Sequence, residues 1–148
     1  MKNGLKCLGL IEIVDKKTGE VLHKGHNMFT NIGLSKIAAW LAGATDVVIP
    51  SVIKIGSSNA EPSLGQTALM GDVLGAKLIE SKEATGPSVL FVTSFNEGEG
   101  TGIWEELGMF DDQDQMWSRA LTGTYTKKDL DKIEIHWTYQ LYDNSEVE

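Results

Sequence analysis

The most regular hydrophobic pattern in the chain is in its last apolar segment, DKIEIHWTYQLYD at residues 131–143. From Ile133 to Leu141, apolar side chains alternate with polar ones. Successive side chains of a strand point to opposite faces of its sheet, so this alternation predicts a strand with one buried face and one face in water. Trp137 falls in the middle of the apolar series, and we expect it in the core.

Further strands are predicted where short apolar runs lie between turn-forming residues. The segment 5–14 is apolar at both parities, which favours a place inside the sheet with both faces covered. A polar insert with a late glycine separates it from segment 20–28, so these two are expected to form a hairpin. The other predicted strands are 47–55, beginning after Pro50, and 76–84, 88–95, 103–110 and 115–126.

One helix is predicted over residues 30–43, TNIGLSKIAAWLAG. Thr30 or Asn31 can cap its first turn, and Gly43 suits the position after its end. Apolar residues recur at the i, i+3, i+4, i+7 spacing that makes one apolar helix face, and Trp40 extends that face. The residues in this series are Leu34, Ile37, Ala38 and Leu41.

These elements predict a mainly β protein that forms a single domain over residues 1–148. No strand–helix–strand rhythm requires a parallel sheet, and sixteen glycines provide for many tight turns. We therefore expect a two-sheet antiparallel sandwich, with a jelly-roll-like strand order as one form of it. One amphipathic helix near residues 31–42 completes the predicted architecture.

Charge and composition restrict the classes of partner that the chain is expected to bind. The formal net charge is −8 and Arg119 is the single arginine, so a nucleic-acid partner is not expected. No stretch approaches the roughly 20 apolar residues that span a bilayer, and Met1–Cys7 lacks the features of a signal peptide. Cys7 is the only cysteine, which predicts folding in a reducing cytoplasm without an intramolecular disulfide.

Candidate catalytic and metal-binding residues are present, but without the patterns that such sites need. The acidic turn 111–114 lacks the glycine and the distal glutamate of an EF-hand. Glu97 and Glu99 lie in a glycine-rich loop that fixes no geometry, although a hydrolase using the region 97–106 is an alternative. Metal ligation by the histidines and nucleophilic chemistry by the cysteine are not expected from their places on strands: His23, His26, His136 and Cys7. We therefore expect no catalytic residue, metal or cofactor.

A structural ion pair is predicted between two neighbouring strands. Adjacent residues of a strand point to opposite faces, so either Glu105 or Glu106 faces inward. A buried carboxylate needs a partner, and Arg119 on the following strand can supply one.

The long segment 56–75, GSSNAEPSLGQTALMGDVLG, is predicted to be the assembly interface. Its apolar residues have no place in the strand pattern, and loops of this length are commonly functional. The expected contact residues are Leu64, Leu69, Met70 and Val73. We expect the segment to become ordered against a neighbouring subunit; the alternative is that it folds over its own sheet and covers an open edge.

Three segments in this order resemble a group of small bacteriophage virion structural proteins of tails, fibres and head surfaces: NMFTNIGLSKIAAWLAG, IKIGSSNAEPSLGQTALMGDV and GIWEELGMFDDQDQMWSRA. The resemblance covers about residues 27–120. It departs from the pattern at Gly71-Asp72-Val73, where the expected arginine after the acidic residue is missing. It implies a virion protein and assigns no catalytic residue.

The resulting hypothesis is a non-enzymatic virion structural protein, made in the host bacterial cytoplasm and incorporated in the virion. It would associate with copies of itself and with other virion proteins, in the tail, in a fibre attachment or on the capsid surface. A capsid decoration protein is the more specific alternative. A carbohydrate-binding jelly-roll module for host recognition is the other, because exposed aromatic rings on a β domain can bind sugars.

Overall fold

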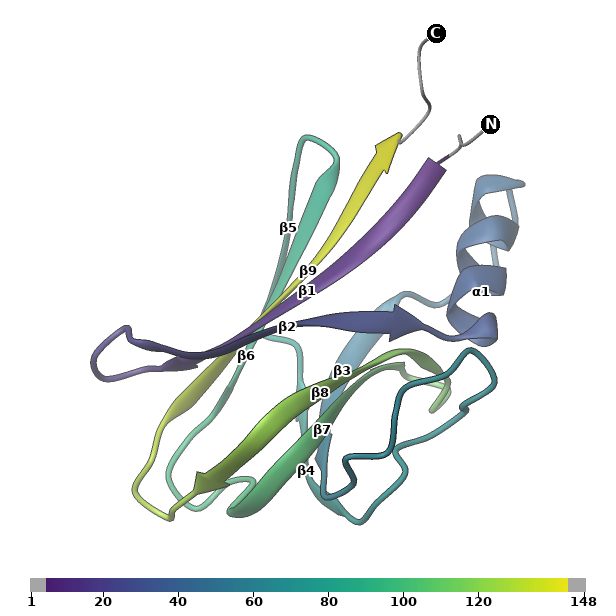
Figure 1. Cartoon of the computed structure of the whole chain (residues 1–148). Helices are drawn as coiled ribbons and strands as arrows, with labels where there is room; N and C mark the ends of the chain where they lie inside the picture. The colour runs from purple at the N-terminus through teal and green to yellow at the C-terminus, as the bar shows by residue number, and fades with distance from the viewer. Residues whose placement is uncertain (1–4, 144–148) are drawn as a thin grey trace, which may run out of the picture.

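The computed structural model describes residues 5–143, which contain nine strands and one helix (Figure 1). The strands are β1 (Leu5–Asp15), β2 (Val21–Phe29), β3 (Pro50–Gly56), β4 (Val73–Leu78), β5 (Ser81–Thr85), β6 (Ser88–Phe95), β7 (Gly102–Asp111), β8 (Met116–Lys127) and β9 (Ile133–Asp143), and the helix α1 spans Asn31–Leu41. Residues 1 and 148, the predicted limits of the domain, lie outside the described residues. So does most of Met1–Cys7, the segment in which no signal peptide is expected.

The described strands form one continuous antiparallel sheet in the order β4-β3-β7-β8-β2-β1-β9-β6-β5. It curls strongly, so that its two halves face each other like an open barrel (Figure 1). The mainly β, antiparallel prediction is confirmed, whereas the predicted sandwich of two separate sheets is not. The reason lies in β2, whose first part pairs with β1 and whose last residues, Asn27–Phe29, pair with β8. One strand thereby joins the two halves.

The predicted strand 76–84 is two strands, because the chain changes partners in its middle. The Ile79 N–H donates to the Ser51 carbonyl at 2.8 Å, and the Glu80 N–H donates to the Val92 carbonyl at 2.8 Å. β4 pairs with β3 at one end of the sheet, and β5 pairs with β6 at the other. This bend carries the chain from one edge of the sheet to the other, as strands do at the corners of orthogonally packed sheets.

The core lies on the inner side of the curled sheet. Ile133, Ile135, Trp137 and Tyr139 are buried, so the alternation predicted for the last strand is confirmed as far as Tyr139, whereas Leu141 is 40% exposed. The segment with both parities apolar, β1, lies between β2 and β9 in the interior of the sheet, as predicted. The prediction that both of its faces are covered is wrong, because Leu10 on its outer face is only half-buried and lines an open hollow.

The helix begins where predicted. The Thr30 hydroxyl accepts the Gly33 N–H at 3.0 Å, which caps the first turn, and donates to the Met116 carbonyl at 2.6 Å. Gly33 is buried, and a Cβ at this position would collide with the backbone of Trp117 on β8. This close approach fixes the first turn of α1 on the sheet. The glycine that weakens the helix pattern is therefore the residue that lets the helix dock.

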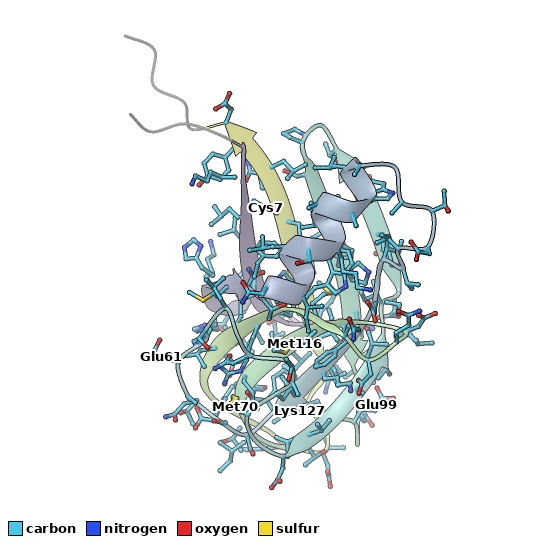
Figure 2. The ribbon with its side chains drawn as sticks, turned by 90° about the vertical axis from the view of Figure 1, so that its right-hand side faces the viewer. Cys7, Glu61, Met70, Glu99, Met116 and Lys127 are labelled. Carbon is cyan, nitrogen blue, oxygen red and sulfur yellow. The ribbon has the colours of Figure 1, made fainter. Side chains whose placement is uncertain are left out.

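The apolar face of this helix is largely exposed. Leu34 is 43% exposed, Trp40 is 62% exposed and Leu41 is 67% exposed. The first turn is held by Gly33 and Thr30. The rest of α1 lies over the inner side of the sheet half that contains β1, β9, β6 and β5 (Figure 2), where Ile37 packs against the core and the helix borders an open groove.

Candidate functional site

Glu106 and Arg119 form a buried ion pair at the centre of the β3-β7-β8 part of the sheet. One carboxylate oxygen of Glu106 lies 2.6 Å from Nη2 and 2.7 Å from Nε of Arg119. Their side chains are 0% and 1% exposed. Glu105, at an irregularity in the pairing of β7 with β8, is only half-buried, and its carboxylate accepts a hydrogen bond from the Thr124 hydroxyl at 2.9 Å. Of the two candidate glutamates, Glu106 is thus the partner of Arg119.

The ion pair also holds the long loop that follows β3. The Glu106 carboxylate accepts the N–H groups of Met70, at 3.0 Å, and Gly71, at 2.8 Å. From the other side, Arg119 donates to the carbonyls of Ser58, at 3.1 Å, and Ala60, at 2.6 Å. Each charge is therefore surrounded by hydrogen-bond partners, the condition under which a buried pair is tolerated.

Small residues make room for this arrangement. Gly56 lies opposite Glu106 in the sheet, and a Cβ at Gly56 would collide with the carboxylate. Gly108 lies opposite Arg119, and a Cβ there would come within 2.8 Å of the Leu69 side chain. The sequence indicated the charged partners, but not that their hydrogen bonds end on the loop.

The predicted interface segment is thus held on its own sheet, as in the alternative that the sequence left open, but its hydrogen bonds run to the interior strands β7 and β8 and not to an open edge. Leu69 is half-buried beside Gly108, while Leu64, Met70 and Val73 are 49%, 52% and 54% exposed. The Leu64 carbonyl accepts the Asn31 N–H at 2.8 Å, which brings the loop to the first turn of α1. Three of the four predicted residues remain accessible: Leu64 and Met70 on a loop that is already ordered, and Val73 at the start of β4. We call residues 57–72 the anchored loop.

This geometry predicts slow amide hydrogen exchange at Met70 and Gly71 in the isolated chain. Their N–H groups are bonded to a buried carboxylate and exchange only when the loop lifts from the sheet. The amides of Thr67 and Ala68, in the same loop, serve as the comparison because no protein acceptor is found for them among the described hydrogen bonds. If the Met70 and Gly71 amides exchange as fast as in an unfolded peptide, the Glu106 carboxylate does not hold this loop on the sheet.

An apolar surface surrounds α1. Its outward stripe consists of Leu34, Ala38 and Leu41, all exposed. Below the helix lies a groove of about 370 Å³, and Ile37 and Trp40 form one wall of it. The sheet side of the groove is also mostly apolar, with one charged residue, Lys82. We call the helix stripe together with this groove the α1 surface.

Cys7 lines the same groove. Burial raises the pKa of its thiol to about 11, so the thiol is protonated at neutral pH. A protonated thiol is a poor nucleophile, and no histidine borders the groove to activate it. Cys7 therefore contributes apolar surface at this position.

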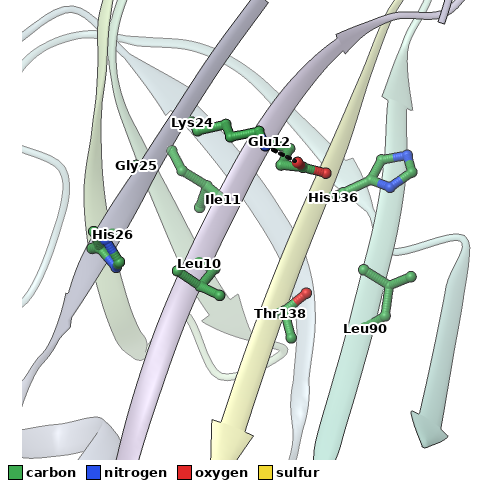
Figure 3. A pocket seen from close by; sticks show the side chains of 9 residues that line it. All are labelled: Leu10, Ile11, Glu12, Lys24, Gly25, His26, Leu90, His136 and Thr138. Carbon is green, nitrogen blue, oxygen red and sulfur yellow. Dashed lines mark ion pairs between the residues drawn. The ribbon is translucent and has the colours of Figure 1, made fainter. Parts of the chain in front are cut away.

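A second hollow of about 540 Å³ lies on the outer face of the sheet, across β2, β1, β9 and β6 (Figure 3). Glu12 and Lys24 form an ion pair across it at 3.5 Å, and their side chains remain partly exposed. His26 and His136 line opposite ends of the hollow, with β1 between them. The His136 Nε2 lies 2.6 Å from a carboxylate oxygen of Glu134 on the same strand, so the two histidines do not contact each other through the hollow.

The glutamates of the hydrolase alternative are engaged in ion pairs. Lys77 contacts Glu99 at 2.6 Å and Lys132 contacts Glu97 at 3.7 Å. The hydrogen bond from Lys77 lowers the pKa of Glu99, which keeps it ionised and unsuited to donate a proton near neutral pH. In the acidic turn, the Asp111 carboxylate accepts hydrogen bonds from the backbone N–H groups of Gln113 and Gln115 and from the indole N–H of Trp117.

Over residues 5–143, no group of three or more histidine, cysteine, aspartate or glutamate side chains is placed to hold a metal ion. Nor does that part of the chain contain a helix with the length and apolar character needed to cross a membrane. Neither protein-family models, nor curated proteins, nor solved structures give a match to this chain.

Proposed function

We propose that this protein is a non-enzymatic structural subunit of a bacteriophage particle and that it joins neighbouring subunits through the α1 surface. One observation carries the proposal: Leu34, Trp40 and Leu41 lie within one short helix and are each more than two-fifths exposed. Single exposed apolar residues are ordinary, but a contiguous group of them beside an apolar groove is typical of protein interfaces.

The distribution of charge supports this use of the surface. The chain carries a net charge of −8, which opposes close approach of protein copies. α1 contains one charged residue, Lys36, and no acidic residue. Subunits can meet at this surface without bringing carboxylates together, and they then gain about 25 cal/mol for each Å² of apolar surface removed from water.

The anchored loop supports the proposal in a second way. An ordered loop loses less conformational entropy on binding than a disordered one. The Glu106–Arg119 pair holds the loop on both sides of Leu64, and the Asn31 N–H donates to the Leu64 carbonyl, which keeps Leu64 beside the first turn of α1. The resemblance to virion structural proteins adds the class of assembly.

The test is a quantitative mass-spectrometric inventory of particles purified from a culture that produces this chain. We expect the chain at a fixed ratio to the other structural proteins. A ratio that follows the major capsid protein would favour capsid decoration, and a low ratio would favour the tail or a fibre attachment. Absence of the chain from washed, intact particles would overturn the proposal.

Carbohydrate binding is kept as a second candidate because the Trp40 ring is 62% exposed beside a groove, an arrangement in which a sugar can stack on the indole. A saccharide array tests it. Binding of a defined glycan that is lost in Trp40→Ala, but retained in Leu130→Ala, would favour this function over assembly. Leu130 is comparably exposed, at 68%, and does not line the groove.

A further inference from the structure

We infer that two copies of this chain associate by antiparallel packing of their α1 helices about a two-fold axis. This inference rests on the proposed function and names one partner for the α1 surface, a second copy of the same chain. It starts from the exposed stripe of α1, in which Leu34, Ala38 and Leu41 follow the i, i+4, i+7 spacing of one helix face.

The stripe is complementary to itself. In an interface with two-fold symmetry, each contact occurs twice with the roles of the copies exchanged. An axis that passes beside Ala38 places Leu34 of each copy against Leu41 of the other. Ala38 then lies at the crossing point, where its small side chain lets the helices approach to the roughly 8 Å at which helices with small contact residues pack.

The electrostatics of the helix allow a second copy to bind here despite the net charge of −8, because α1 contains no acidic residue. Lys36 is the one charged residue in α1, and it is half-buried, off the exposed stripe. Antiparallel helices also place the positive end of each macrodipole beside the negative end of the other. An anionic lipid surface fits poorly, because helices that bind such surfaces carry several Lys or Arg residues on their polar face, and this chain is strongly acidic.

The contact offered by one eleven-residue helix is small, so the pair is expected to be weak in dilute solution and strengthened where copies are held side by side. The association must therefore be measured at high protein concentration. Sedimentation velocity of the full chain should show a weight-average mass that rises from monomer towards dimer as concentration increases.

A matched pair of substitutions locates the contact. Leu41 is 67% exposed on α1 and Leu130 is 68% exposed in the β8–β9 turn. We expect Leu41→Asp to weaken association by at least about tenfold, because an aspartate would be desolvated between the helices. Leu130→Asp introduces the same charge at equal exposure and should leave association unchanged. Near-UV circular dichroism of both variants checks that the fold is retained.

Cross-linking gives a second, independent measurement. In a Cys7→Ser background, Ala38→Cys should form a disulfide-linked dimer under mild oxidation, since the two-fold axis brings the two positions close together. Gln113→Cys, in the exposed β7–β8 turn, is the control and should form at least about tenfold less of that dimer.

The outcomes separate this inference from the proposed function. A chain that stays monomeric at all concentrations, or a dimer that Leu41→Asp does not weaken, overturns the inference. So does equal cross-linking at positions 38 and 113. If the chain is nevertheless found in particles, the proposed function stands and the α1 surface contacts a different protein. If the chain forms this dimer but is absent from particles, the inference about the α1 contact stands and the proposed function fails.

Discussion

Glu106→Gln is expected to lower the free energy of unfolding by about 3–5 kcal/mol, the range found when a buried ion pair loses one partner. The amide keeps the size of the side chain but removes its charge, so the Arg119 guanidinium remains buried without compensation. One of the two oxygens that now accept the Met70 and Gly71 N–H groups also becomes an NH2 donor, so one of these N–H groups loses its acceptor. Urea denaturation at neutral pH gives the measurement.

Glu105→Gln is the matched control. It makes the same chemical change at the neighbouring, half-buried residue, where the carboxylate bonds only the Thr124 hydroxyl among the described contacts. We expect it to alter the free energy of unfolding by less than about 0.5 kcal/mol. Equal effects of the two substitutions would show that burial at Glu106 has no energetic role.

A double-mutant cycle isolates the pair itself. Combining Glu106→Gln with Arg119→Met should cost less than the sum of the single changes, with a coupling of about 0.5–3 kcal/mol. The same cycle with Glu105→Gln should show coupling near zero. If Glu106→Gln loosens the loop as well, the Met70 and Gly71 amides will exchange faster in this variant than in the parent.

Much of the local structure follows from patterns that act over a few residues. The alternation in β9 and the cap at Thr30 are set by short-range geometry, and both were predicted. The bend between β4 and β5 was not, because its cause is the hydrogen bonding of Ile79 and Glu80 to strands far apart in the sequence. The continuity of the sheet through β2 depends on long-range pairing in the same way.

The candidate site shows the same division. The parity argument reduced the partner of Arg119 to two adjacent glutamates, and the fold then selected Glu106. The exposure of the α1 stripe was missed, because an apolar helix face has the same spacing whether it packs on its own domain or on another subunit. In the structure, Gly33 docks the first turn and Ile37 contacts the core, while Leu34, Ala38 and Leu41 face away from the sheet.

Trp137→Ala is expected to cost about 3–5 kcal/mol, as large aromatic-to-alanine changes in cores do. Trp137 is 0% exposed and lies between Ile11 of β1 and Phe91 of β6 in the sheet register. Its indole N–H donates to the Asn27 side-chain oxygen at 2.7 Å. Asn27 stands where β2 passes from β1 to β8, so the tryptophan packs the core and also supports the point at which the two halves of the sheet join.

Two further variants divide this effect into its parts. Trp137→Phe retains most of the buried ring but removes the indole donor, and we expect a loss of about 1–3 kcal/mol because the Asn27 oxygen is left without that donor. It also keeps the test informative if the alanine variant does not fold, since 3–5 kcal/mol is a large part of the 5–15 kcal/mol that stabilises an ordinary domain. Trp40→Ala, at a ring that is 62% exposed, should change the stability of the monomer by less than about 1 kcal/mol. Thermal melting compares all three: Trp137→Ala should lower the Tm by roughly 10 °C or more, and a shift no larger than that of Trp40→Ala would show that the inward face of β9 is wrongly assigned.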